Sequence, residues 1–99
     1  MVDESILQRD AATAIRAQAL LDDELLSEAF DKLEANYIAA WRGTVIDDAA
    51  GREKLFLAVN VVGKVRDHLA SVVANGKLAQ AELKELAQIA ERRKRFGIL

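Results

Sequence analysis

The chain has 99 residues, of which 52% are hydrophobic and 30% charged, a composition that fits one folded domain over residues 1–99 and excludes a disordered chain. It has no cysteine and no apolar run near the roughly 20 residues that cross a bilayer, so we expect neither a disulfide scaffold nor a membrane protein. The net charge is −2, but residues 1–51 hold 11 acids and 4 bases, whereas residues 52–99 hold 10 bases and 5 acids. A domain divided in this way attracts its own other half, a second copy of itself or an external polyanion, and the split favours assembly over chemistry as the function.

Long helices with short connections are expected along the chain. Proline is absent, while alanine, leucine, glutamate, lysine and arginine are abundant. The first five residues, MVDES, are acidic and unlike the basic start of a signal peptide. We therefore expect a soluble protein of the cytoplasm.

Two helical segments are predicted in the first half. Residues 4–21 are rich in alanine, which packs thinly, so this segment is predicted to be the least anchored element. Residues 22–42 begin with three acids, Asp22 being the expected cap, and end before Gly43. The pattern leaves open whether the two segments form one helix or two. The apolar face of the second segment contains Leu26, Phe30, Leu33, Tyr37, Ala40 and Trp41, and Trp41 is expected to be buried. The alternative for Tyr37 and Trp41 is an aromatic anchor at a subunit interface.

Residues 43–51 are expected to form a bend, with Asp47 or Asp48 capping the helix that follows. The strongest pattern is a run of three heptads over residues 52–75, ending at Asn75-Gly76, with Gly63 marking a kink or a close helix crossing. The positions that face a partner in this pattern, and are candidates for self-association, are Leu55, Ala58, Val62, Val65, Leu69 and Val72.

A further helix is predicted over residues 78–94. A helix over residues 52–75 would be roughly 36 Å long, which exceeds the diameter of about 34 Å of a compact chain of this size. The sequence therefore predicts an all-α fold, an elongated hairpin or bundle of three to four helices with one long central helix.

Catalysis and metal binding have little support in the sequence. The single histidine, His68, adjoins Asp67, and neighbours on a helix point about 100° apart. The acids from Asp22 to Glu24 are contiguous and fan out, as capping residues do. We therefore expect no enzymatic activity, no metal and no cofactor.

A basic run closes the last predicted helix: Arg92, Arg93, Lys94 and Arg95. Cations complement the negative end of a helix dipole, but four in succession exceed what capping requires. The run is a candidate site for DNA phosphates or for an acidic protein partner.

Four short stretches of the chain resemble small helical proteins of phages and prophages. They are residues 37–42 (YIAAWR), 51–55 (GREKL), 65–69 (VRDHL) and 75–77 (NGK). Proteins of that kind belong to the DNA-packaging and head module. More distantly, the chain resembles the oligomerising helical hairpin of small terminase subunits, although it has no helix-turn-helix upstream and no β-rich tail downstream.

The resemblance and the charge split together imply a non-enzymatic assembly or DNA-packaging accessory protein that forms homo-oligomers through its helices. Two alternatives remain open: a small nucleic-acid-binding regulator that uses the basic end, and a helical adaptor of cellular origin.

Overall fold

Three helices and one loop make up residues 3–95, the part of the chain that the computed structural model describes. They are α1 (Glu4–Asp22), α2 (Glu24–Arg42) and α3 (Ala49–Arg95). Helix accounts for 91% of these residues, and no strand occurs among them. The all-α class and the long helix are therefore confirmed.

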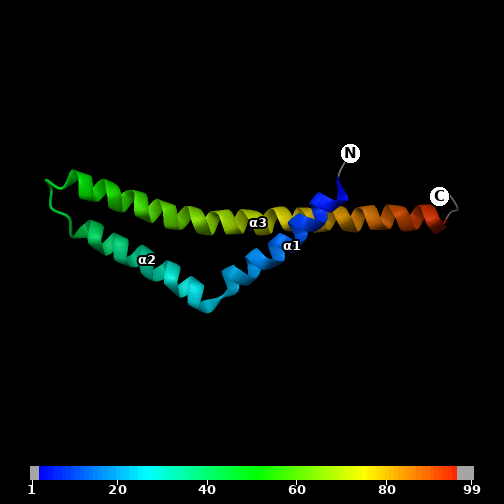
Figure 1. The fold of residues 1–99 in the computed structure, drawn as a ribbon, viewed down its shortest axis with the longest axis horizontal. Helices are drawn as coiled ribbons and strands as arrows, with labels where there is room; N and C mark the ends of the chain where they lie inside the picture. The colour runs from blue at the N-terminus through cyan, green and yellow to red at the C-terminus, as the bar shows by residue number, and fades with distance from the viewer. Residues whose placement is uncertain (1–2, 96–99) are drawn as a thin grey trace.

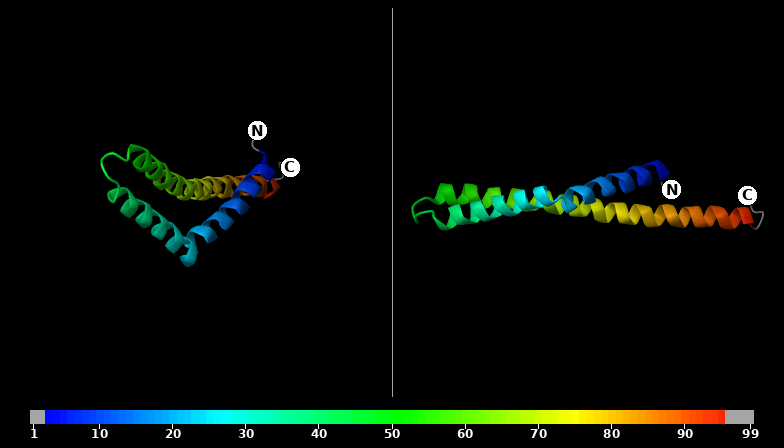
Figure 2. Two further views of the ribbon diagram at one scale, coloured as in Figure 1. Left: turned by 60° about the vertical axis from the view of Figure 1, so that its left-hand side comes forward. Right: turned by 90° about the horizontal axis from the view of Figure 1, so that it is seen from below.

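The molecule is long and thin. α1 and α2 form a V whose apex stands away from α3 while its two arms meet α3, and both run opposite to α3 (Figure 1). Viewed from below, the helices occupy one shallow layer (Figure 2). The extents are 76 × 28 × 15 Å and the radius of gyration is 21.6 Å, against about 13 Å for a compact chain of 100 residues. The expected elongation is confirmed.

Asp23 separates α1 from α2 and decides that the first two segments are two helices. Its backbone is extended, with φ −68° and ψ 118°. Its carboxylate accepts a hydrogen bond from the Leu26 N–H at 2.8 Å, which caps α2. Asp22, the expected cap, is instead the last residue of α1.

The other helix starts are capped by aspartate side chains, and α2 ends at a glycine. Asp3 caps α1, and hydrogen bonds from the hydroxyl and then the backbone N–H of Ser5 lower the pKa of Asp3. Gly43 ends α2 as expected. The predicted bend is confirmed over residues 43–48, where the Asp48 carboxylate accepts from the Gly51 N–H at 2.9 Å.

α3 does not stop at Asn75-Gly76, so the prediction of two helices over residues 52–94 is wrong. It runs unbroken for 47 residues. Gly76 is needed instead for a close helix crossing, since a β-carbon there would lie 1.9 Å from Cβ of Ala14 and 3.0 Å from the Asp10 carbonyl oxygen. The crossing expected at Gly63 is not there, because nothing lies within 4 Å of a β-carbon built on that residue.

The crossing of α1 over α3 is also the core. Within residues 3–95 the buried hydrophobic side chains all lie there: Leu7, Ala14, Ala17, Val73 and Ala79. α1 makes the more extensive contact with α3, so the expectation that it is the least anchored element is wrong. Alanine and glycine have small side chains, so the backbones of α1 and α3 can approach closely and pack tightly. The alanine content of α1 alone therefore does not predict weak packing.

The two glycines of α3 should respond oppositely to alanine. Gly63→Ala should raise the free energy of unfolding by about 1 kcal/mol, because the site is open and alanine favours helix. Gly76→Ala should lower it by about 1–3 kcal/mol through overpacking against Ala14. Urea midpoints measure both variants.

Ala14→Gly, added to Gly76→Ala, should restore part of the lost stability, since it removes the Ala14 β-carbon with which the new alanine would clash. A Gly76→Ala variant as stable as the wild type would contradict the crossing.

Candidate interaction surfaces

Arg66 of α3 joins the two arms of the hairpin formed by α2 and α3. One guanidinium nitrogen donates to the Ser27 carbonyl oxygen at 3.0 Å and to the Asp31 carboxylate at 2.7 Å, while the other lies 3.6 Å from Glu34. The guanidinium also stands 5.0 Å from the centre of the Phe30 ring. The planar group thus holds three successive turns of α2 in register with α3.

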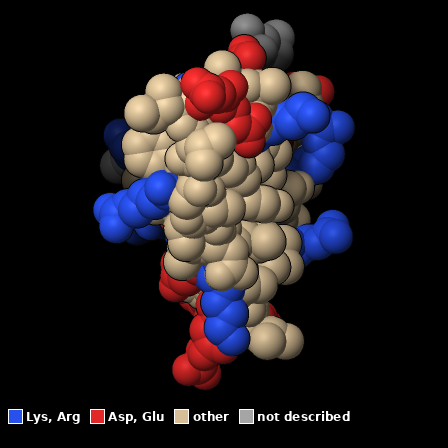
Figure 3. Space-filling model, turned by 90° about the vertical axis from the view of Figure 1, so that its left-hand side faces the viewer, with Lys and Arg blue, Asp and Glu red and all other residues tan. Residues whose placement is uncertain are grey.

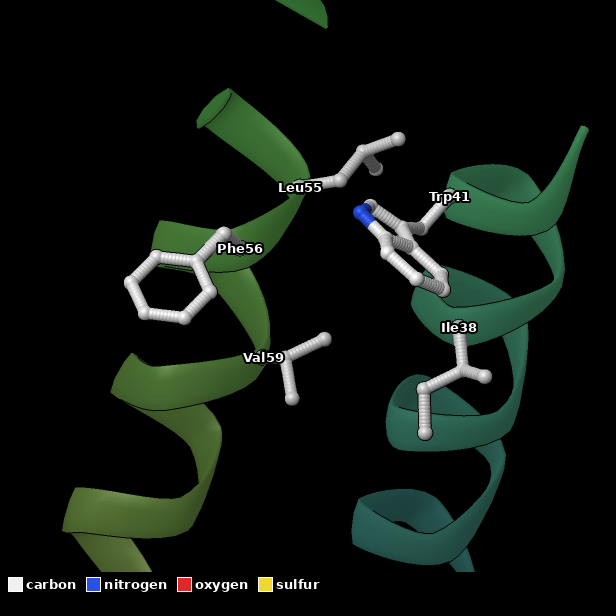
Figure 4. A pocket seen from close by; sticks show the side chains of 5 residues that line it. All are labelled: Ile38, Trp41, Leu55, Phe56 and Val59. Atoms are coloured by element: carbon white, nitrogen blue, oxygen red, sulfur yellow. The ribbon is translucent and has the colours of Figure 1, made fainter. Parts of the chain in front are cut away.

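Nearer the loop, an apolar groove lies between α2 and α3. It is lined by Ile38 and Trp41 from α2 and by Leu55, Phe56 and Val59 from α3 (Figure 4). The Trp41 indole lies toward Leu55, whereas the Phe56 ring points away from α2 (Figure 4). Trp41 is 48% exposed and Phe56 63%, so the expected burial of Trp41 is wrong. α2 has no buried residue, and the side chains that line the groove with the indole come from α2 itself and from α3.

The six heptad positions are incompletely covered within one chain. Val65 is 44% exposed, and the others are half-buried: Leu55, Ala58, Val62, Leu69 and Val72. Leu55 lines the groove beside Trp41, and Val72 lines a hollow beneath α1 with Asp10, Thr13 and Asn75. These positions therefore retain apolar surface that could bind another helix.

The hairpin tip exposes apolar side chains that the sequence analysis did not single out. Ile46 is 90% exposed and Val45 68%. Seen from this end, uncharged surface fills the middle of the molecule and charged side chains lie toward its edges (Figure 3). Two apolar residues in succession within a predicted bend are the signal that could have identified this tip.

The basic run lies on the last turn of α3. All four side chains, Arg92, Arg93, Lys94 and Arg95, are exposed. This end of α3 extends beyond the start of α1, so neither of the other helices covers it (Figure 1). Within residues 3–95, this placement leaves the four cations exposed at one end of the molecule.

Residues 3–95 give little support for a metal site, a histidine-based site or a membrane span. No group of three histidine, aspartate or glutamate side chains there could hold a metal ion. His68 is exposed on α3. None of the helices in the described range is long and apolar enough to cross a membrane.

Replacing Arg66 should loosen α2. Arg66→Ala should lower the free energy of unfolding by about 1 kcal/mol, since the side chain is part-exposed and water screens its ion pairs. Arg66→Lys should recover little, because an ammonium cannot reproduce the forked contacts. Lys84→Ala, on the same helix and exposed, is the matched control for thermal unfolding. Equal midpoints for all three variants would contradict this role.

Comparison with known proteins identifies no family for the chain. No protein-family model matches it, and neither a curated protein nor a solved structure does. A function must therefore be argued from the surfaces themselves.

Proposed function

We propose that this protein is a non-enzymatic assembly protein whose copies associate through their helices. The observation that carries the proposal is its surface area. The chain exposes 7856 Å², whereas a compact monomer of 10.9 kDa exposes about 5,600 Å². The surplus of about 2,300 Å² is more than the roughly 800 Å² that each partner buries in a standard interface.

The identity of the exposed residues supports the same proposal. Only five hydrophobic side chains are buried in residues 3–95, and three of them are alanines. Fourteen large hydrophobic side chains are exposed there, which reverses the usual balance of a monomer. Burying part of this surface against another copy would supply apolar burial that one chain does not provide for itself.

The phage-type role rests on the sequence resemblance. Proteins that build or load a phage head act as repeated copies, and an elongated, self-associating helical chain suits that kind of work. We therefore propose assembly or DNA packaging in a phage-type system as the setting of the self-association.

A second function, contact with DNA, is favoured by one observation. Four exposed bases occupy the last turn of α3, where neither α1 nor α2 lies over them (Figure 1). Contacts from such a cluster go to phosphates and carry no sequence information. An acidic protein surface would meet the same charges.

Light scattering should give a mass above 10.9 kDa at micromolar concentration, falling on dilution. Far-ultraviolet circular dichroism should lose signal over the same range, because the interface completes the burial of apolar surface. A mass of 10.9 kDa at every concentration, with full helicity, would refute self-association.

The basic end should affect binding and leave folding unchanged. Replacing Arg92, Arg93, Lys94 and Arg95 by alanine should weaken binding to duplex DNA equally for all sequences. Each lost phosphate contact should reduce the slope of log K against log salt by about 0.9. Thermal midpoints should barely move, since exposed substitutions change stability by about 0.5 kcal/mol or less.

The matched control replaces four exposed lysines elsewhere in the chain by alanine and so changes the net charge equally. They are Lys32, Lys54, Lys77 and Lys84. Fluorescence anisotropy at low and moderate salt compares the two variants with the wild type. Equal DNA affinity for all three would assign the basic end to capping α3 or to a protein partner.

A further inference from the structure

One row of apolar side chains on α3 is poorly covered by the other helices. Leu57, Val61, Val65 and Leu69 recur every four residues, the spacing of a continuous ridge on a helix surface. Leu57 is 56% exposed, Val61 59% and Val65 44%, and Leu69 is half-buried. These four residues are named the α3 ridge.

A shallow hollow of about 300 Å³ lies along the α3 ridge. It is lined by Val61, Lys64, Val65, His68 and Leu69. The ridge and the hollow lie on the same stretch of one helix, so this stretch offers both a projecting row and a depression beside it. Helices pack when the ridge of one enters the groove of the other.

We propose that two copies of the chain pair through the α3 ridge, about a two-fold axis near Val61 and Val65. The inference rests on the self-association proposed above and specifies its face. A two-fold contact uses the same patch on both copies, so it requires a patch that complements itself. A ridge with its own adjoining hollow meets this requirement.

The position of α1 sets how the two copies cross. α1 occupies α3 at Val73, Gly76 and Ala79, directly beyond the ridge. A partner helix lying parallel to α3 along the ridge would run into α1. Ridges spaced four residues apart interlock at about −50°, and such a crossing carries the partner away from the axis of α3. This packing geometry fits the ridge spacing and leaves α1 in place.

Charge favours a second copy over a foreign partner. The ridge itself is uncharged, and Lys64 is the one lysine, arginine or carboxylate among the residues that line the hollow. A strongly charged partner would find little countercharge there, whereas two copies would bring two uncharged ridges together and leave the exposed Lys64 side chains at the edge of the contact. The cores of homodimer interfaces are apolar in the same way.

Glutamate substitutions test the face. Val61→Glu and Val65→Glu should each shift the dissociation midpoint at least tenfold, because the two-fold axis would bring the carboxylate of one copy against the same carboxylate of the other. Leu78→Glu is the matched control: Leu78 lies on α3, is 67% exposed and stands outside the ridge. Sedimentation velocity over a dilution series should give the control the mass of the wild type.

Disulfide trapping tests the same contact if a glutamate variant fails to fold. The chain has no cysteine, so single substitutions report without background. Val61→Cys or Val65→Cys should form a dimer on mild oxidation, since a disulfide requires Cα atoms within about 7 Å. Ala90→Cys should not form a dimer, because residue 90 lies about 38 Å along α3 from Val65 and about 44 Å from Val61.

The outcomes separate the two proposals. Glutamate variants that keep the wild-type mass, or failure of both ridge cysteines to cross-link, would overturn the ridge while leaving self-association intact. Cross-linking at Ala90→Cys alone would overturn it too, and would move the contact to the far end of α3. A wild-type protein that stays monomeric at every concentration would remove the self-association on which the ridge depends.

Discussion

The close approach of Ala14 to Gly76 is the contact on which the rest of the architecture depends. It joins residues far apart in the sequence and is the centre of the buried core in residues 3–95. Because α1 is held there and only Asp23 separates it from α2, the crossing also limits where α2 can begin. The V of α1 and α2 follows from one tight contact and one break in the helix (Figure 1).

Two kinds of packing divide α3. Around Gly76 the backbones are close and small side chains fill the contact. No residue of α2 is buried, and Arg66, which meets the first half of α2, supplies much of the specificity of its contact with α3. The charge split of the sequence is thereby partly satisfied within the chain, since a base of the second half meets Asp31 and Glu34 of the first. The apolar surface left uncovered lies mainly on the loosely packed half.

Periodicity and capping residues were enough to predict the all-α class, the elongated shape, the stop at Gly43 and the bend before Asp48, because these features depend on local chemistry. Local sequence could not predict the roles of Gly76 and of the alanines of α1. A glycine that ends a helix and a glycine that allows a close helix crossing look the same in the sequence until the partner helix is known. Trp41 was misjudged for a related reason: its spacing gives the face, but not how many helices cover that face. The exposure of Arg92–Arg95 agrees with their charge. The heptad pattern includes Val65 and Leu69 of the α3 ridge but misses Leu57 and Val61, because the ridge repeats every four residues.

The length of α3 sets the distance between the two ends of the molecule. Its 47 residues rise about 1.5 Å each and hold the hairpin tip about 70 Å from the basic end. A structure built from many copies would inherit that spacing from the residue count alone. Inserting or deleting seven residues would change it by about 10.5 Å while nearly preserving which face points outward, whereas one or two residues would rotate one end against the other by about 100° or 200°. The length of this helix therefore fixes the distance and the relative orientation of the two surfaces at its ends.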